Sequence, residues 1–154
     1  MDLVLFEIDG RRYALPAADV REILPAVTIV PLPHAPPVVE GLIDVRGALV
    51  PVLDVRARFR HPPKAAVHTD HLILARAGPR LVAVRADRAL EVVRVAADAV
   101  EPARTAAQDA GAIADAAGLP DGLVLVPDLR AFLTRPEGDA LDGAMAARAG
   151  GGAA

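Results

Sequence analysis

The stretch from Gly41 to Val55 constrains the fold of this chain more than any other. Two runs rich in Leu, Ile and Val are separated only by Arg46 and Gly47, and this spacing predicts a β-hairpin whose tight turn uses the positive φ that Gly47 can adopt. Both arms are almost continuously apolar, which is typical of strands covered on both faces, as in a small closed barrel. Asp44 and Arg46 fall on one side of their strand, because side chains alternate with period two. The pattern therefore predicts a buried hairpin with one polar edge.

Further strands are expected on both sides of this hairpin, because short apolar runs recur between Gly, Pro and Asp residues. The expected strands cover residues 3–8, 11–15, 27–30, 71–75, 81–84, 90–95 and 123–126. Short helices are expected from Pro16 through Glu22, over Arg56–Phe59, over Asp128–Leu133, and after a capping box formed by Thr134 and Glu137. Residues 31–37, 61–70 and 104–111 have the composition of loops. The chain is therefore expected to be all-β with short helices.

An internal repeat relates the two halves of the chain. Asp54 and Arg56 are matched 74 positions later by Asp128 and Arg130, and the strand before each Asp is matched as well. Residues 13–15 are likewise echoed 69 positions later by residues 82–84. In each copy the Asp precedes a predicted helical turn, where its carboxylate can accept hydrogen bonds from free backbone N–H groups. We expect both Asp residues to be caps, with a catalytic carboxylate pair as the alternative.

The inventory of side chains excludes several classes of enzyme. The chain has no Cys and no Ser, so it has neither a disulfide framework nor a Ser or Cys nucleophile. A metal-dependent enzyme that uses His61, His68 and His71 with Asp70 stays as an alternative, although these residues lie in a Pro-containing loop at the start of a strand. The inventory therefore excludes hydrolases of the usual triad kind.

Charge and hydropathy bear on partners and location. The net charge is −3 and the aromatic share is 3%, which argues against a small barrel that binds nucleic acid, because such a protein needs a basic patch and stacking platforms. The N-terminus has an acid and no basic run, and no apolar stretch reaches the ~20 residues that cross a bilayer. We expect a cytoplasmic protein without membrane insertion.

Several motifs occur together in one order along the chain. They are Tyr13-Ala14-Leu15-Pro16, Val20-Arg21-Glu22-Ile23-Leu24, Pro33 with Pro36, Gly41 with Arg46-Gly47, Pro51 and Asp54, and Asp121 to Val126 with Asp128-Leu129. Together they resemble the CheW-like chemotaxis coupling protein family over almost the whole chain. The resemblance implies two intertwined five-stranded β-barrels and a C-terminal helix within one CheW-like domain over residues 1–150. We expect the first barrel at 12–65, the second at 1–11 with 66–135, the helix at 136–148 and a flexible tail at 149–154.

The resemblance also implies a function. Proteins of this family are scaffolds without catalytic activity, and they couple the cytoplasmic tips of methyl-accepting chemoreceptors to the regulatory domain of a CheA-type histidine kinase. The resemblance therefore implies a chain that is not an enzyme and has no cofactor. The positions that match the family's receptor groove are Val20, Glu22, Gly41 and Arg46. Arg46 suits such a groove, because a guanidinium can pair with a carboxylate such as Glu22. The sequence does not separate this function from that of an adaptor in a non-flagellar chemosensory pathway with another output.

Three features depart from the family's pattern. Asp44 stands where Asn is usual, so a group that only accepts hydrogen bonds replaces one that also donates them, and we expect Asp44 to compete with Glu22 for Arg46. Arg85 interrupts a strand that is normally apolar. Residues 112–118 match the corresponding segment poorly. These departures bear on the identity of the partner more than on the fold.

Overall fold

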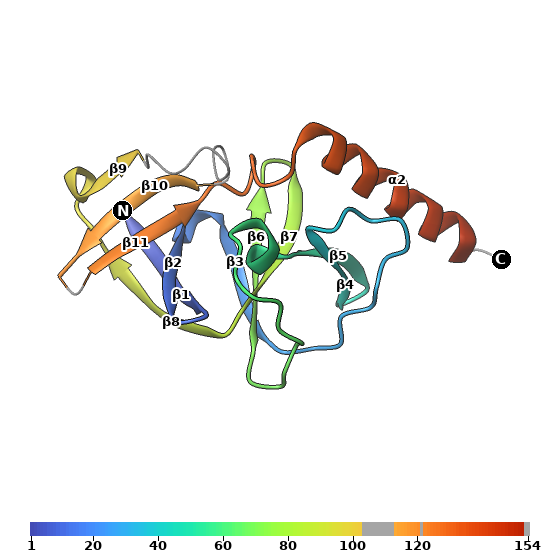
Figure 1. Cartoon of the computed structure of the whole chain (residues 1–154), viewed down its shortest axis with the longest axis horizontal. Coiled ribbons are helices and arrows are strands. Elements are labelled where there is room, and N and C mark those ends of the chain that lie inside the picture. Colours follow the sequence, from blue (N-terminus) through green and yellow to red (C-terminus); the bar gives the residue numbers. More distant parts are fainter. Residues whose placement is uncertain (103–112, 121, 153–154) are drawn as a thin grey trace.

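The strands form two sheets that lie side by side in the computed structural model, which describes residues 1–102, 113–120 and 122–152 (Figure 1). The six-stranded sheet has the order β8 (Arg88–Arg94), β1 (Asp2–Ile8), β2 (Arg11–Pro16), β11 (Gly122–Pro127), β10 (Ile113–Leu119), β9 (Val100–Pro102). The five-stranded sheet has the order β3 (Val20–Pro25), β6 (His71–Ala77), β7 (Arg80–Ala86), β5 (Ala48–Leu53), β4 (Val39–Val45). The helical elements are η1 (Ala17–Asp19), α1 (Val55–Arg58), η2 (Ala97–Ala99) and α2 (Arg135–Gly152).

The expected fold, mostly β with short helices and a C-terminal helix, is confirmed. Among the described strands, both sheets are open ladders rather than closed barrels.

Each sheet contains strands from both halves of the chain. The six-stranded sheet combines the first hairpin, β1 and β2, with β8 to β11 from the second half, whereas the five-stranded sheet combines β3 to β5 with the hairpin β6 and β7. The two hairpins join their sheets through equivalent parallel pairs, Leu125 with Tyr13 and Val52 with Ala83. The sequence repeat is therefore a structural repeat whose halves exchange hairpins.

This exchange corrects the expected division of the chain. Residues 71–86 belong to the five-stranded sheet, although we expected them in the second barrel, and residues 12–16 belong to the six-stranded sheet, although we expected them in the first. The apolar pattern of a strand is a local property, but the partner of each hairpin is set by pairing between residues far apart in sequence. Local periodicity does not contain that information.

Asp87 lies where the chain passes from β7 in one sheet to β8 in the other. Its backbone N–H donates to Glu7 O (2.9 Å), and its carboxylate accepts the Asp9 N–H (2.8 Å) and the Arg56 guanidinium (2.6 Å). Burial by itself would raise the pKa of Asp87, but these two donors together with Lys64 hold the pKa below its usual value. Asp87 therefore ties α1 to the β1–β2 turn across the junction between the sheets.

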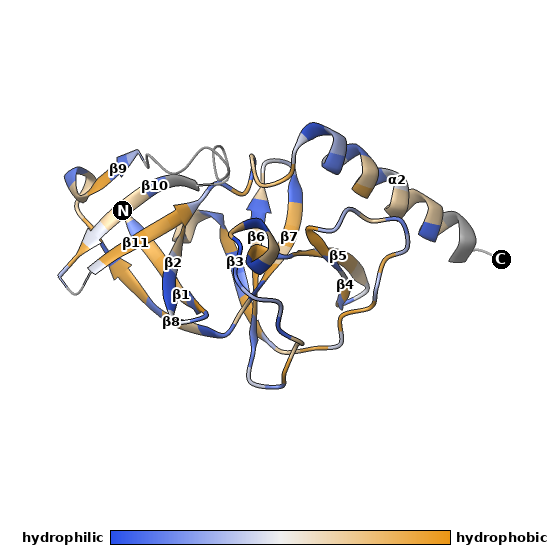
Figure 2. Ribbon diagram, in the orientation of Figure 1, coloured by the Kyte–Doolittle hydropathy of each residue, from blue (hydrophilic) through white to orange (hydrophobic). Residues whose placement is uncertain are grey.

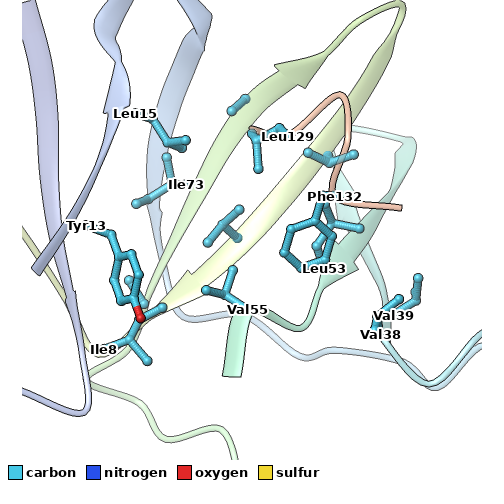
Figure 3. Close-up of a cluster of buried hydrophobic side chains, with 14 of the residues drawn as sticks. Ile8, Tyr13, Leu15, Val38, Val39, Leu53, Val55, Ile73, Leu129 and Phe132 are labelled. Carbon is cyan, nitrogen blue, oxygen red and sulfur yellow. The ribbon is translucent and has the colours of Figure 1, made fainter. Parts of the chain in front are cut away.

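The main hydrophobic core fills the junction between the two sheets. Figure 3 shows Leu15 from the six-stranded sheet near Ile73 from the five-stranded sheet, and Leu53 from the five-stranded sheet beside Phe132. The chain's four aromatic residues form one column there, because Phe6 stacks on Tyr13, Tyr13 on Phe59, and Phe59 meets Phe132 edge-on. Hydrophobic segments follow the strands on both sides of this junction (Figure 2).

Each sheet also has a small core of its own. The core of the six-stranded sheet contains Leu3, Leu5, Ala14, Val95, Ala117, Val124 and Val126. The core of the five-stranded sheet contains Ile43, Val50, Val52, Leu72, Leu74 and Ala83. The arms of the central hairpin therefore have two covered faces, one toward the junction and one toward this small core, as their continuous hydrophobicity predicted.

Some local expectations are wrong. The helix expected from Pro16 through Glu22 is only the three-residue η1, and the chain then continues as β3, because the pairing of Val20–Pro25 with β6 outweighs helical spacing. Residues 27–30 form no strand and contribute one bridge, between Val30 and Leu42. The helix expected at 128–133 is a turn. β10 was not expected, because its Ala and Gly residues give a weak strand signal, and the loop expected at 104–111 lies outside the described residues.

The C-terminal helix α2 begins with the predicted capping box. Glu137 N–H donates to Thr134 Oγ1 (3.3 Å), and Thr134 N–H donates to Glu137 Oε1 (2.8 Å). Glu137 also pairs with Arg58 from α1, and Leu141 is fully buried in the main core. The helix extends over Arg135–Gly152, so it is longer than the expected 136–148 and includes residues 149–152 that we expected in a tail.

Candidate protein-binding site

The four residues that match the family's receptor groove all lie on the five-stranded sheet. Val20 and Glu22 belong to β3, Gly41 belongs to β4, and Arg46 lies in the turn that follows β4. These two strands are the opposite ends of the hydrogen-bonded order β3-β6-β7-β5-β4. The site therefore takes residues from both edges of one sheet.

Arg46 and Glu22 join these two edges by a bidentate ion pair. Arg46 Nη1 donates to Glu22 Oε1 (3.2 Å) and Nη2 donates to Oε2 (2.5 Å), while the two side chains are 68% and 29% exposed. The hydrogen bonds from Arg46 lower the pKa of Glu22, and Glu22 in turn raises the pKa of Arg46. The pair stays charged at neutral pH and keeps a planar guanidinium at the surface, where it can bind a further carboxylate.

The hairpin turn holds Arg46 in place. Arg46 and Gly47 have φ values of 51° and 88°, which is the two-residue turn that suits the twist of a hairpin. The left-handed conformation costs a non-glycine residue about 1 kcal/mol, and the turn gains a hydrogen bond from Gly47 N–H to Asp44 Oδ1 (2.7 Å). The expected competition of Asp44 for Arg46 is therefore wrong, because this turn needs only an acceptor at Asp44.

Gly41 is a buried supporting residue. A Cβ on Gly41 would lie 2.3 Å from Val30 O, a distance that no methyl group can occupy. The close approach allows Val30 and Leu42 to exchange two backbone hydrogen bonds of 2.8 Å each. Val20 is half-buried against the main core and lies beside a β-bulge. Of the four predicted residues, Glu22 and Arg46 thus face solvent, and Gly41 and Val20 support them.

Several exposed apolar residues are neighbours of the ion pair, either along the chain or through strand pairing. Ile23 follows Glu22 on β3, Val30 pairs with β4, and Leu49 lies opposite Asp44, with exposures between 41% and 46%. A mixture of exposed apolar side chains and a partly exposed guanidinium is typical of protein–protein interfaces, in which Arg and large apolar residues contribute most. The arrangement suits a protein partner, because it combines apolar contact with one directional charge.

A second ionic cluster, centred on Arg85, lies on the same sheet. The Arg85 side chain is only 6% exposed, and its guanidinium donates to Glu40 (3.0 and 3.1 Å), to Asp70 Oδ2 (3.0 Å) and to the carbonyl of Lys64 (2.7 Å). In the sequence, Arg85 stands out only as an interruption of an apolar strand. Its partners Glu40 and Asp70 lie 45 and 15 positions away, so only the fold brings them together.

The histidines of the metal-site alternative are engaged separately. His61 Nε2 lies 2.6 Å from the Tyr13 hydroxyl, His71 Nδ1 accepts the Ala89 N–H (3.2 Å), and Asp70 pairs with Arg85. Among the described residues, no three or more His, Cys, Asp or Glu side chains are placed to hold a metal ion. The geometry gives this alternative no support.

The repeated Asp residues are caps, as predicted. Ala57 N–H donates to Asp54 Oδ1 (3.0 Å) at the start of α1. The backbone N–H groups of Arg130 and Ala131 donate to Asp128 Oδ1 at 3.1 and 3.3 Å. Each carboxylate is therefore occupied by the turn that follows it.

Comparisons with known proteins identify relatives of this chain. The family model described as "CheW-like domain" matches residues 2–137. Chemotaxis protein CheW of Rhizobium meliloti is 28% identical over 108 residues, which cover 70% of each chain. The probable chemotaxis protein CheW of Rhizobium etli is 26% identical over 101 residues, which cover 66% of this chain and 65% of the relative.

The fold comparison concerns a crystal structure of the scaffolding protein TtCheW from Thermoanaerobacter tengcongensis. It superposes with a TM-score of 0.81 at 23% identity, covering 88% of this chain and 94% of the other, so it supports the fold. No helix in the described part of the chain is both long enough and apolar enough to cross a membrane. Because the family model matches most of its residues, the chain belongs to the CheW-like domain family of chemotaxis coupling proteins.

Proposed function

We propose that this CheW-like adaptor couples the cytoplasmic tip of a methyl-accepting chemoreceptor to the regulatory domain of a CheA-type histidine kinase. The Arg46–Glu22 pair is the observation that carries this proposal. It stays charged, it is partly exposed, and it has exposed apolar neighbours on the same sheet. Receptor tips are helical, and a helix that presents apolar and acidic side chains complements such a surface.

The roles of the four residues differ in this proposal. Arg46 contacts the receptor directly, and Glu22 holds its guanidinium in a fixed orientation. Gly41 and Val20 act indirectly, because Gly41 admits the Val30 backbone and Val20 packs β3 on the main core. The side-chain inventory fits an adaptor as well, since the chain contains no Ser or Cys nucleophile.

Reconstitution with the host's own partners tests the proposal. Purified chain is mixed with the host's histidine kinase and with vesicles that carry its methyl-accepting receptors, and kinase co-sedimentation and activity are measured. We expect Arg46→Glu to abolish most receptor-dependent recovery of the kinase while the melting temperature stays close to that of the wild type. Wild-type recovery with this variant would rule out the receptor contact, and unfolding of the variant would show that Arg46 is structural.

Arg88→Glu is the matched control. Arg88 is 63% exposed and pairs with Glu7, which is 24% exposed, so its surroundings resemble those of Arg46 in the other sheet. We expect this variant to behave as the wild type. The same experiment with receptors and kinases of each chemosensory pathway in the host shows whether the output is flagellar chemotaxis or another response.

A further inference from the structure

Arg85 is placed where an apolar residue would fill the small core of the five-stranded sheet. Alternation along β7 puts it on the same face as Leu81 and Ala83, which contact that core. A buried guanidinium is costly unless every donor finds an acceptor. Here each of its three nitrogens donates to Glu40, Asp70 or the Lys64 carbonyl.

Glu40 is the extra residue of a β-bulge in β4. The strand pairs Val39 with Leu53 and then Gly41 with Val52, so Glu40 has no partner on β5. Its side chain reaches Arg85 on β7, which lies on the far side of β5. The ion pair therefore fixes the bulge from across the intervening strand.

The bulge lies immediately before the residue that makes the closest backbone approach of the site. Gly41 packs against Val30 O, and Val30 bonds to Leu42 on the outer edge of β4. β4 then leads directly to the turn that carries Arg46. Side chains alternate between the two faces of a sheet along a strand. Loss of the extra residue at the bulge would therefore move every side chain between the bulge and the turn to the opposite face.

Stability alone does not explain this cluster. Two carboxylates share one guanidinium, and Asp70 Oδ1 is buried without a hydrogen-bond partner among the described residues. Burial is the largest influence on Glu40 and raises its pKa, although Arg85 acts in the opposite direction. Apolar side chains of similar volume commonly stabilise a protein as well as a buried ionic cluster does, so stability gives no reason for an ionic cluster at this place.

We propose that Arg85 is a positioning residue for the receptor-contact site: by holding Glu40 it fixes the bulge that keeps Gly41 against Val30 and sets the edge strand that ends at Arg46. This inference deepens the proposed function and rests on it for the receptor contact. Whether Arg85 fixes the position of β4 can be tested without any receptor.

The test replaces the cluster with apolar groups while keeping the fold. In the triple variant Glu40→Leu, Asp70→Asn, Arg85→Met, no unpaired charge is left, and the amide in Asp70→Asn still accepts the Val67 N–H that Asp70 Oδ2 accepts at 3.0 Å. We measure the free energy of unfolding by denaturant titration. Amide hydrogen exchange is followed at Val30 and Leu42, with Ile73 in the central strand β6 as reference.

We expect wild-type stability and unchanged exchange at Ile73. Exchange at Val30 and Leu42 should be faster by about tenfold or more, because local opening of β4 costs less free energy when Arg85 no longer holds the bulge. Wild-type protection at both amides in a folded variant would overturn the proposal. Arg80→Met is the control, since Arg80 is also on β7 but pairs with Asp142 on α2, and it should leave both amides unchanged.

A second variant decides the question if the triple variant does not fold. Arg85→Lys keeps the charge, but an ammonium cannot make the forked contacts to Glu40, Asp70 and the Lys64 carbonyl together. We expect faster exchange at Val30 and Leu42 in this variant also, and wild-type exchange would overturn the proposal.

Affinity for the host receptor tip gives the second readout. We expect the folded variants to lose about tenfold in affinity while Arg80→Met loses none, as a change of geometry at a contact site reduces binding without removing it. Exchange at Val30 that increases without a loss of affinity would overturn the role at the receptor site. If the wild type does not bind the tip, the proposed function fails, and the exchange data still decide whether Arg85 places β4.

Discussion

Two arginine–glutamate pairs of similar exposure distinguish the two sheets. In the six-stranded sheet, Arg88 and Glu7 lie opposite each other on the paired strands β8 and β1. In the five-stranded sheet, Glu22 lies on β3 and Arg46 lies in the turn that follows β4, and these two strands do not pair with each other. The same chemistry therefore adds a cross-strand contact to one sheet, whereas it joins the edges of the other.

The repeated Asp and Arg residues show the same difference. Asp54 and Asp128 both cap a turn, but Arg56 is buried and bonds to Asp87, whereas Arg130 is exposed and has no ion pair among the described residues. The duplication has kept the strands and the caps, while only the first of the two repeated arginines, Arg56, is part of a buried ion pair. We therefore expect substitutions at matched positions to have unequal effects.

The largest difference is expected for glycine substitutions in the matched strands β4 and β10. Gly41→Ala places a methyl group 2.3 Å from Val30 O, so it should lower the free energy of unfolding by about 3 kcal/mol or prevent folding. Gly118→Ala meets no atom within 4 Å and should change stability by less than about 0.5 kcal/mol. Chemical denaturation of both variants measures the difference, and equal effects would show that the Val30 contact is not needed.

The matched arginines give the next largest difference. Arg56→Met removes one partner of a buried pair, so that Asp87 Oδ1 and the Pro62 carbonyl lose their hydrogen bonds from the guanidinium, which should cost about 3 kcal/mol. Arg130→Met alters an exposed side chain and should cost less than about 0.5 kcal/mol. Thermal and denaturant unfolding would contradict the comparison if Arg130→Met were the more damaging change.

Acid should weaken the junction on the Arg56 side first. The pKa of Asp87 and the pKa of Glu137 are both below their usual values in the folded protein. These two groups therefore stabilise the fold above the unfolded-state pKa of about 4. This contribution is lost as the pH falls through the folded-state pKa values. Melting temperatures between pH 7 and acid should therefore fall. Asp87→Asn should be less stable at pH 7 but should lose less on acidification, and an unchanged slope would contradict the role of Asp87.

The smallest effect is expected for the two exposed pairs. Arg46→Gln and Arg88→Gln should each lower the melting temperature only slightly, because exposed ion pairs contribute little and are screened by salt. Arg46→Gln should have the larger effect, since the native Arg46–Glu22 pair joins two edge strands that are not hydrogen-bonded to each other in the sheet. Scanning calorimetry at low salt compares them, and a larger effect of Arg88→Gln would argue against a bracing role for Arg46.

The elements that sequence predicted correctly depend on neighbouring residues. The Arg46–Gly47 turn and the cap at Asp54 follow from local chemistry, which a short window contains. β3 was mistaken for a helix because its pairing with β6 is not visible locally. The exchange of hairpins between the sheets was missed for the same reason, since the register of distant strands decides it.

The role of the candidate site in receptor binding stays a prediction. The resemblance selected Glu22 and Arg46, and their residue types suggested the pair that the structure contains. For Gly41 the resemblance indicates a place at the groove, and the structure adds the close approach to Val30 O, which no local pattern contains. Arg85 was noticed only as an anomaly, because no local signal connects it to Glu40.

The aromatic column at the junction has a spectroscopic consequence. The chain contains a single tyrosine and no tryptophan, so its intrinsic ultraviolet emission comes from Tyr13, which is packed between Phe6 and Phe59 beside His61. Emission from that one phenol is therefore sensitive to the packing at the junction between the two sheets. The native protein has an intrinsic optical probe at this junction, without an added dye.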